Sequence, residues 1–344
     1  MSDNRPEQAE YEYIVVGSGA GGGTVAARLA EAGHSVVLLE AGGDPRDSTA
    51  EAPATVDSRL PSDYDVPCFH AFASENEAMR WDYFVRHYQN DEQQHRDPKF
   101  IETYAGKQVN GVLYPRAGTL GGCTAHNAMI FIYPHDEDWN EIADLTGDES
   151  WRADKMRRHF ERLENCHHRG LYRWPAKLGW NPTRHGFDGW LSTEKAIPML
   201  SLGNADLIET IVDSTVTAVR EIGDLPQRIR WAAEGMLDPN DWRTVRHNAF
   251  GIRYLPLTTK KHARNGARER VLDVAKKHLL KIELNALATR VLFEEDRAVG
   301  IEYLSGRKIY RAHPHHVEES GEVRRVFASR EVILAGAPSI LLNS

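Results

Sequence analysis

The strongest constraint on the fold is a group of closely spaced glycines near the start of the chain. Residues 13–16 form a short, continuous apolar run that ends at a glycine, which is typical of a buried parallel strand. Residues 21–32 are small residues and helix formers, and residues 35–39 are a second apolar run. Between the first run and the expected helix, the spacing G-x-G-x-x-G occurs at Gly17, Gly19 and Gly22. The sequence therefore predicts the strand, helix and strand of a dinucleotide-binding unit.

Each glycine of this fingerprint has a physical role. Gly17 permits a tight turn, Gly19 lets the backbone approach a pyrophosphate, and Gly22 lets the helix pack closely on the strand. The phosphates then lie at the positive end of the helix. Glu40, 18 residues after Gly22, can accept hydrogen bonds from a ribose hydroxyl, and its charge disfavours NADP. FAD and NAD both fit these residues, whereas a glycine turn without a ligand is disfavoured because so many required features coincide.

Strand and helix patterns of the same kind return near the end of the chain. A helix is expected at 267–278, and apolar strand patterns occur at 281–286, 289–293, 298–304 and 331–335. The fold class that these patterns predict is α/β, a three-layer FAD/NAD(P)-binding (Rossmann-like) domain.

The segments between these patterns are less regular. Residues 41–100 are polar and rich in proline, and we interpret them as long loops with short helices around 75–88. Residues 151–166 have the apolar spacing of a helix, and 311–325 predict a charged, His-rich loop or hairpin. Residues 170–245, rich in Trp, Arg, Pro and Gly, indicate an inserted domain.

These patterns predict two domains. The dinucleotide-binding domain is expected to be discontinuous, formed by residues 1–160 and 250–344. Residues 161–249 are expected to form a partial α+β substrate-binding or cap region.

Charge and composition exclude several other classes of protein. Lys and Arg number 42 against 50 Asp and Glu, a net charge of −8, which argues against nucleic acid as a partner. No stretch approaches the roughly 20 apolar residues of a membrane span, and the polar N-terminus lacks a signal-peptide core, so we expect a cytoplasmic protein. Cys68, Cys123 and Cys166 are scattered and predict no disulfide framework.

A second glycine-rich segment, Pro115–Phe131, favours FAD. It contains L-G-G-C-T-A-H-N, beginning at Leu120, and its Gly-Gly turn lets backbone amides approach a flavin and its pyrophosphate. With the first fingerprint, this segment resembles the glucose–methanol–choline (GMC) family of flavin oxidoreductases, whose signature is near L-G-G-small-small-x-x-N. The resemblance extends over most of the chain, through Leu39–Gly42, Asp138-Trp139, Leu287–Phe293, Ala298–Ile301 and Glu331–Ala337.

The resemblance implies a function and a set of cofactor-binding residues. The implied reaction oxidises the CH–OH group of an alcohol (sugar, polyol, choline-like or aliphatic) to a carbonyl, with hydride transfer to flavin N5. The implied partners are this small-molecule alcohol and an electron acceptor, which is oxygen, a quinone or a cytochrome. The implied FAD-binding residues are Gly17, Ser18, Gly19, Ala20, Gly22, Glu40, Ala41, Arg116, Gly121, Gly122, Cys123, His126, Asn127, Ala128, Met129, Ala288, Ala335 and Gly336.

His126 carries a further implication of the resemblance. Choline-oxidase-like members of the family read S-H-N here, and that histidine bonds covalently to the flavin 8α-methyl carbon, whereas this chain reads A-H-N at 125–127. We hypothesise a histidyl–FAD bond through His126, since neutral imidazole is a competent nucleophile. The alternative is a histidine that packs beside the flavin without a bond or faces solvent.

The chain also departs from the family. Its end, A-G-A-P-S-I-L-L-N-S, differs from the second family signature, and the family continues for roughly another 200 residues, about one more domain. The family's catalytic histidine and its His or Asn partner lie in that part, so no catalytic residue is assigned within 1–344. We expect a fragment that can be inactive alone. The alternatives are a nonenzymatic FAD-binding remnant and another flavoenzyme class, such as an amine oxidase or hydroxylase, which would lack the second motif.

Three other groups of residues receive plain structural interpretations. Cys166–His168 with His159, and the histidines within 313–316, lack the spacing of a zinc site, so we expect solvated loop histidines and no metal. The basic run 260–270 is interpreted as a solvated loop leading into a helix, with the alternative that it lies near phosphates. Trp81 and Tyr83 are expected either to line the route to the flavin or to pack in the core.

Overall fold

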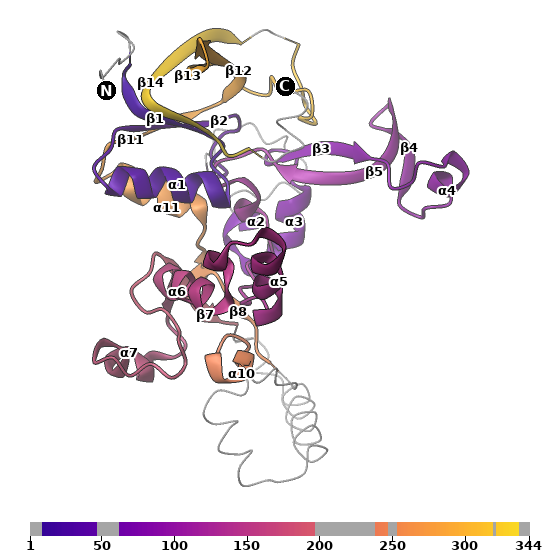
Figure 1. The fold of residues 1–344 in the computed structure, drawn as a ribbon. Coiled ribbons are helices and arrows are strands. Elements are labelled where there is room, and N and C mark those ends of the chain that lie inside the picture. Colours follow the sequence, from indigo (N-terminus) through magenta and orange to yellow (C-terminus); the bar gives the residue numbers. More distant parts are fainter. Residues whose placement is uncertain (1–8, 47–61, 197–237, 247–252, 319–320, 337–344) are drawn as a thin grey trace. The chain divides into compact units, whose positions relative to one another are not determined.

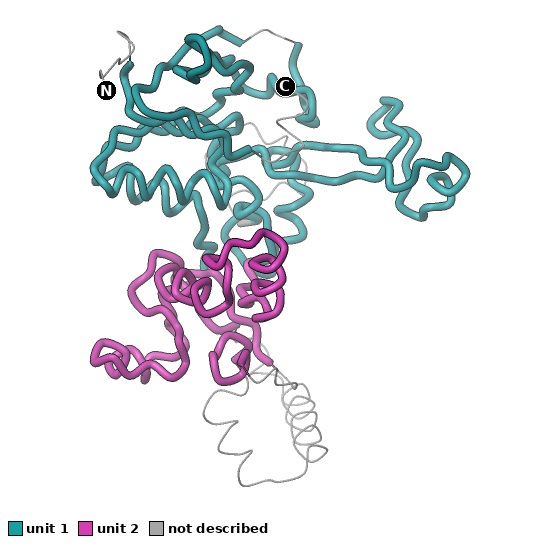
Figure 2. Tube along the Cα trace, viewed as in Figure 1, with its two compact units in different colours: residues 1–128, 263–344 teal, residues 129–262 magenta. Residues whose placement is uncertain are grey.

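The structure is a computed structural model of the chain, and it describes residues 9–46, 62–196, 238–246, 253–318 and 321–336. The chain divides into two compact units, shown in different colours in Figure 2. Unit 1 comprises residues 1–128 and 263–344, and unit 2 comprises residues 129–262.

The elements of unit 1 are as follows, with η denoting a short 3₁₀ helix (Figure 1). Its strands are β1 (Tyr11–Val16), β2 (Val36–Glu40), β3 (Arg80–Val85), β4 (Phe100–Tyr104), β5 (Lys107–Ala117), β10 (Ala263–Arg264), β11 (Leu280–Leu284), β12 (Ala286–Glu294), β13 (Arg297–Ser305) and β14 (Glu322–Leu334). Its helices are α1 (Ala20–Glu31), α2 (Ser62–Asp65), η1 (Pro67–Phe69), α3 (His70–Glu75), α4 (Asp91–His95), η2 (Gly122–Ala125) and α11 (Ala267–Ala275).

The main sheet has the strand order β11-β2-β1-β14-β13-β12. The first four strands are parallel, as expected for buried apolar runs such as V-V-L-L in β2. β14 changes partners along its length: residues 322–327 pair antiparallel with β13, and residues 328–334 pair parallel with β1. The predicted strand 331–335 is therefore the end of a longer strand, and residues 322–325, predicted to lie in a loop or hairpin segment, belong to that strand.

Alternating side chains of the parallel strands bury both faces of the sheet. Val15, Val36 and Leu38 pack against α1 and α11, and their neighbours Ile14, Val37 and Leu39 pack against the β12–β13–β14 meander. The result is three layers, helices, parallel sheet and antiparallel meander, which confirms the predicted α/β, Rossmann-like fold class. The expected elements at 13–16, 21–32, 35–39 and 267–278 correspond to β1, α1, β2 and α11.

The segment 80–117 differs from the prediction. Residues 80–85 form β3, which pairs antiparallel with β5, and β5 also pairs with β4, so the three strands form an arm (Figure 1). Short helices were expected around 75–88, where the structure has only the end of α3 before this strand. Cross-strand aromatic contacts explain the strand, because Tyr83 lies opposite Tyr114 and the sequence R-W-D-Y-F-V is rich in residues that favour strands.

Unit 2 is built around Arg157, which is fully buried on α6. Its Nη2 atom donates to the carbonyl oxygens of Thr183 (2.9 Å) and Asn240 (2.7 Å), and its guanidinium lies over the rings of Tyr133 and Phe160. The described elements of unit 2 are α5 (Asp136–Thr146), η3 (Glu149–Trp151), α6 (Ala153–Leu163), β6 (Glu164–Cys166), α7 (Gly170–Lys177), β7 (Leu191–Lys195), α10 (Trp242–Arg246), β8 (Pro256–Leu257) and β9 (Thr259–Lys260).

The units divide at 128/129 and 262/263, whereas the sequence placed the boundaries at 160/161 and 249/250. Packing within unit 2 accounts for the first difference, since Phe131 and Tyr133 contact Phe160 of α6. Most of the expected insertion at 170–245 lies outside the described residues. Within the described part of the chain, no helix is both long enough and apolar enough to cross a bilayer.

Two neighbouring glycines of α1 give a matched test of this packing. A Cβ atom on Gly22 would lie 2.0 Å from the Gly17 carbonyl oxygen, whereas a Cβ on Gly21 would meet nothing within 4 Å. We expect Gly22→Ala to lower the free energy of unfolding by about 3 kcal/mol. Gly21→Ala should be neutral or stabilise by up to about 1 kcal/mol, since alanine favours helix. Urea unfolding of the FAD-free chain, followed by circular dichroism, measures both, and equal losses would contradict the packing argument.

Candidate functional site

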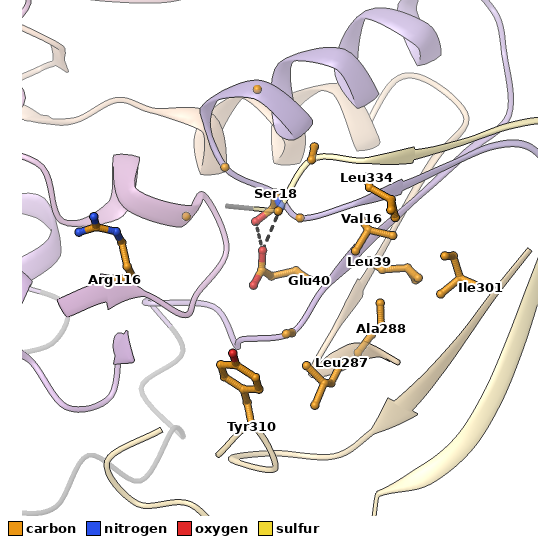
Figure 3. A pocket seen from close by; sticks show the side chains of 18 of the residues that line it. Val16, Ser18, Leu39, Glu40, Arg116, Leu287, Ala288, Ile301, Tyr310 and Leu334 are labelled. Atoms are coloured by element: carbon orange, nitrogen blue, oxygen red, sulfur yellow. Dashed lines mark hydrogen bonds between the residues drawn. The ribbon is translucent and has the colours of Figure 1, made fainter. Parts of the chain in front are cut away.

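A cavity of about 480 Å³ opens in unit 1 at the carboxyl ends of β1 and β2. This is where ligands bind in open α/β sheets, because the loops after parallel strands diverge there. Val16 and Leu39 end the strands at its edge, and Tyr310 and Arg116 lie on its other sides (Figure 3). The cavity brings together both glycine motifs of the sequence.

Ser18 joins the two motifs. Its hydroxyl donates to Glu40 Oε2 and accepts from the backbone N–H of Gly121 (2.9 Å), and its own N–H also donates to Glu40 Oε2 (3.0 Å) (Figure 3). Glu40 Oε1 accepts from the N–H of Gly42 (2.9 Å). Three buried residues, Ser18, Glu40 and Gly121, therefore connect the first fingerprint, the acid at the end of β2 and the second motif.

Burial raises the pKa of Glu40, and the hydrogen bonds from Ser18 and Gly42 oppose that rise only in part. A carboxylate offers about four acceptor positions. Ser18 donates to two of those of Glu40 and Gly42 to a third, and the Ala41 N–H also lowers the pKa of this group. Glu40 lines the cavity wall.

The backbones of the two glycine motifs also touch. Gly122 has a φ of +52°, and a Cβ there would lie 2.7 Å from the Cα of Gly19. Gly17 has a φ of +94° and lies against the backbone of Ala335 and Gly336. By contrast, the nearest atom to a Cβ on Gly19 would be 4.0 Å away, in Gly122. The backbone conformation and packing of the protein thus require glycine at 17 and 122, whereas the protein alone leaves space for a Cβ atom at residue 19.

The N-terminus of α1 is open to an anion. Its N-cap residue is Gly19, which provides no side-chain cap, and the first turn holds no acidic residue. The first N–H groups of a helix lack partners within the helix and carry its positive partial charge. This end of α1 suits a phosphate group.

Arg264, at the end of β10, holds the second motif in place. It is buried and donates to the carbonyl oxygens of Thr124 (3.0 Å) and Asn127 (2.9 Å), whereas the nearby Arg268 forms an ion pair with Asp44 (2.6 Å). The interpretation of 260–270 as a solvated loop is therefore wrong for these two residues. Backbone carbonyls compensate the burial of Arg264 and a carboxylate that of Arg268, and a sequence displays neither partner.

His126 lies beside these arginines, at the end of η2. Burial, with the charges of Arg264 and Arg116, lowers its pKa to about 4, so the ring is neutral near pH 7. Its Nδ1 atom is buried and has no hydrogen-bond partner among the described residues. Such an unpartnered nitrogen fits a histidine whose partner is a ligand.

The structure brings most of the expected FAD-binding residues to the cavity wall. The lining residues are Gly17, Ser18, Gly19, Ala20, Glu40, Ala41, Arg116, Gly122, Cys123, Ala288, Ala335 and Gly336. The remaining expected residues do not line it: Gly22, Gly121, His126, Asn127 and Ala128, with Met129 assigned to unit 2. Gly22 and Gly121 instead pack against protein backbone, and Asn127 bonds to Arg264.

The apolar and aromatic part of the cavity wall was not predicted from the sequence. Leu287, Ile301 and Tyr310 line the cavity from the returning meander and the loop after it. Trp81 also lines it, 4% exposed, and packs on the Tyr310 ring at 4.6 Å between centroids. Trp81 therefore packs on an aromatic neighbour and also lines the cavity, whereas no local motif marks Tyr310.

Around Cys166, the expectation of solvated loop histidines is wrong for His168, whereas His167 is exposed as expected. Cys166 is buried at the end of β6, and the His168 side chain is only 3% exposed. They lie with His185, which the sequence reading had not connected to them. His159 and His315 are exposed, as expected, whereas His313 and His316 are half-buried.

The fold and the paired glycine motifs define a flavin-type dinucleotide-binding protein, and the comparisons identify its family. The chain belongs to the GMC oxidoreductases, whose family model matches residues 11–344. An oxygen-dependent choline dehydrogenase from Pseudomonas syringae pathovar tomato is 29% identical, covering 98% of this chain and 48% of the relative. One from Pseudomonas fluorescens is 30% identical, covering 86% and 42%. The chain spans about half the length of these curated relatives.

Solved structures share the fold. Pyridoxine 4-oxidase from Mesorbium loti aligns with a TM-score of 0.60 at 20% identity, covering 94% of this chain and 49% of that one. A formate oxidase variant from Aspergillus oryzae, described by its effect on FAD modification, aligns at 0.59 and 16% identity, covering 96% and 46%.

The bridge through Ser18 can be tested by removing its hydroxyl. Ser18→Ala removes one of the hydrogen bonds to Glu40 and leaves the Gly121 N–H without its buried partner, so we expect the free energy of unfolding to fall by about 1–3 kcal/mol. Thr24→Ala on the outer face of α1 removes a solvent-facing hydroxyl and should change it by less than about 0.5 kcal/mol. Urea unfolding measures both variants, and a neutral Ser18→Ala would refute the bridge.

His126 should make the FAD-free chain sensitive to acid. Its pKa is about 4 in the folded protein against 6.5 unperturbed, so the unfolded chain binds a proton first as the pH falls. Stability is complete above pH 6.5 and is lost towards pH 4, by about 1–2 kcal/mol between pH 7.5 and 5. His126→Gln should remove that part of the pH dependence in urea unfolding, whereas His95→Gln, on the exposed arm, should not.

Proposed function

We propose that the chain binds FAD in the unit 1 cavity and serves the oxidation of an alcohol to a carbonyl, with electrons passed to a separate acceptor. The observation that carries the proposal is the convergence of two glycine motifs, 100 residues apart in sequence, on one wall through Ser18 and the Gly19–Gly122 contact. A cavity of this kind suits one extended nucleotide ligand.

The residues of the wall divide by chemistry into places for the parts of FAD. The N–H groups that begin α1, after Gly19, would hold the pyrophosphate. Glu40 would accept the ribose hydroxyls. The apolar side chains of Leu39 and Leu287 would enclose the adenine ring, and Arg116 adds a positive charge at the end nearer the second motif.

FAD, when bound, supplies the hydride acceptor for an alcohol CH–OH group. The chain's own residues bind it and keep its phosphates against backbone amides rather than water. Assignment of unit 1 to FAD and unit 2 to the substrate side is part of the same proposal. The similarity to choline dehydrogenases favours a small hydroxyl-bearing substrate, such as an amino alcohol, over other substrate classes.

We further propose that His126 forms a covalent bond to the flavin. Its ring is neutral because its pKa is lowered to about 4, and its Nδ1 has no hydrogen-bond partner among the described residues. A neutral, unpartnered imidazole nitrogen is the form that can act as a nucleophile.

Gly19→Ala tests FAD binding with little effect on the fold. A Cβ at residue 19 has 4.0 Å of room in the protein alone, so the free energy of unfolding should stay within about 0.5 kcal/mol. The same Cβ occupies the approach of the pyrophosphate and should weaken FAD binding roughly 30–100-fold, or about 2–3 kcal/mol. Flavin fluorescence titration measures the affinity, with Gly170→Ala, at a glycine of unit 2 whose Cβ position is open, as the control.

Reconstitution of the full chain with FAD then tests turnover. Reduction of a dye driven by choline, a sugar or an aliphatic alcohol supports the oxidoreductase. FAD binding without dye reduction by any alcohol indicates a flavin-binding module, and failure to bind FAD overturns the proposal as a whole.

Acid precipitation of the reconstituted chain tests the histidyl bond. Yellow colour should stay with the precipitate of the wild-type chain and move to the supernatant for His126→Ala. Release of all colour from the wild-type protein would show that the flavin is held without a covalent bond.

A further inference from the structure

Unit 2 holds a second group of chemically reactive side chains, separate from the FAD cavity. Cys166 ends β6, His168 follows two residues later, and His185 lies in the segment before β7. Their ligand-type atoms all lie within 4.8 Å of one another. The side chains of His168 and His185 are 3% and 0% exposed, and Cys166 is fully buried, so the group is closed to bulk water.

The distances within this group are those of a metal site. Cys166 Sγ lies 3.6 Å from His168 Nε2, and Asp238 Oδ2 lies 3.3 Å from His168 Nε2 and 3.1 Å from His185 Nε2. Zinc bonds of about 2.3 Å to sulfur and about 2.0–2.1 Å to nitrogen and oxygen, at tetrahedral angles, require about 3.6 Å between sulfur and nitrogen. They require about 3.3 Å between nitrogen and oxygen. These three distances fit, but His168 Nδ1 also lies 3.6 Å from Cys166 Sγ, so the His168 ring has to turn for its Nε2 to face a metal.

A carboxylate behind His185 completes the pattern. His185 Nδ1 lies 2.8 Å from Glu164 Oε2, and Glu164 is itself held by the hydroxyl of Thr193 (2.7 Å) and the N–H of Gly186 (3.2 Å). A metal-bound histidine characteristically donates its second N–H to such a carboxylate, which fixes the ring and leaves Nε2 free to bind. Glu164 is fully buried, so this orientation is firmly set.

We propose that Cys166, His168 and His185 bind one zinc ion in unit 2, and that the Asp238 carboxylate, which lies against both histidines, moves in as the fourth ligand. Thiolate, imidazole and carboxylate donors in a four-coordinate arrangement select zinc over the hard cations calcium and magnesium. Burial leaves no open position for a substrate, so the ion is structural. It would join the β6–β7 region to the segment around Asp238.

The competing arrangement is a purely hydrogen-bonded network. Without metal, both histidines share protons with Asp238, and His185 also bonds to Glu164. Burial alone would lower the pKa of His168, but its hydrogen bonds to Asp238 and Cys166 raise that pKa to about 9. Zinc would displace the protons on the metal-binding ring nitrogens and that of the thiol, whereas the Nδ1–H of His185 stays donated to Glu164. Arg169, whose Nε lies 3.8 Å from Asp238 Oδ2, offsets the negative charge that the thiolate adds.

Metal content and cobalt spectroscopy separate the two arrangements. The full chain, freed of metal by a chelator and incubated with zinc, should retain one zinc per chain after gel filtration, with a raised melting temperature. Cobalt(II) in its place should give the intense visible bands of tetrahedral coordination and a sulfur-to-cobalt charge-transfer band in the near ultraviolet. Neither readout depends on FAD or on activity, so it succeeds or fails independently of the proposed function.

Variants assign the ligands. Cys166→Ala should abolish the charge-transfer band, and His168→Gln should lower zinc retention at least tenfold. His167→Gln, next in sequence but directed at Ser192, and Cys68→Ala, at an exposed cysteine, should leave both unchanged. A wild-type chain that retains no zinc, or gives only the weak bands of octahedral cobalt, overturns the proposal even if Cys166→Ala does not fold. So would a charge-transfer band that persists in folded Cys166→Ala.

Discussion

The contact between the two glycine motifs determines the rest of unit 1. Gly19 and Gly122 approach so closely that a Cβ at 122 would lie 2.7 Å from the Cα of 19, and the Ser18 hydroxyl connects Glu40 to the Gly121 amide. These groups are buried, so each hydrogen bond satisfies a group that would otherwise be costly to bury. A wall lined by backbone amides follows from this approach, and only a ligand that binds backbone donors can use it fully.

The sequence predicted the parts of this fold that local chemistry specifies. The apolar runs in β1 and β2, the small residues of α1 and the fingerprint spacing each constrain the backbone directly, and the structure has all of them. The arm at 80–117 was predicted poorly because its strands are stabilised by cross-strand contacts such as Tyr83 with Tyr114. Those contacts depend on pairing between distant residues, which local periodicity does not encode.

The same distinction explains the buried charges. Arg264 lies in a basic run that resembles a solvated loop, yet its guanidinium is bonded to Tyr64, Thr124 and Asn127, up to 200 residues away. His185 is likewise 17 residues from His168 in sequence, and only the fold places the two rings 5.6 Å apart. A charged residue becomes structural through partners on other segments, so spacing rules for motifs miss it.

A comparison of the three fingerprint glycines distinguishes those that the packing of the protein requires from the one that it does not. Gly17 is required by its φ of +94°, with backbone atoms 3.1 Å from an added Cβ, and Gly22 is required because an added Cβ would lie 2.0 Å from the Gly17 carbonyl oxygen. A protein could need both of them simply to pack α1 against β1 and β14. Gly19 has no such internal requirement, since its nearest neighbour would be 4.0 Å away. A Cβ at residue 19 would therefore obstruct no part of the polypeptide. In the proposed FAD complex, that Cβ would lie where the pyrophosphate meets the backbone amides of α1.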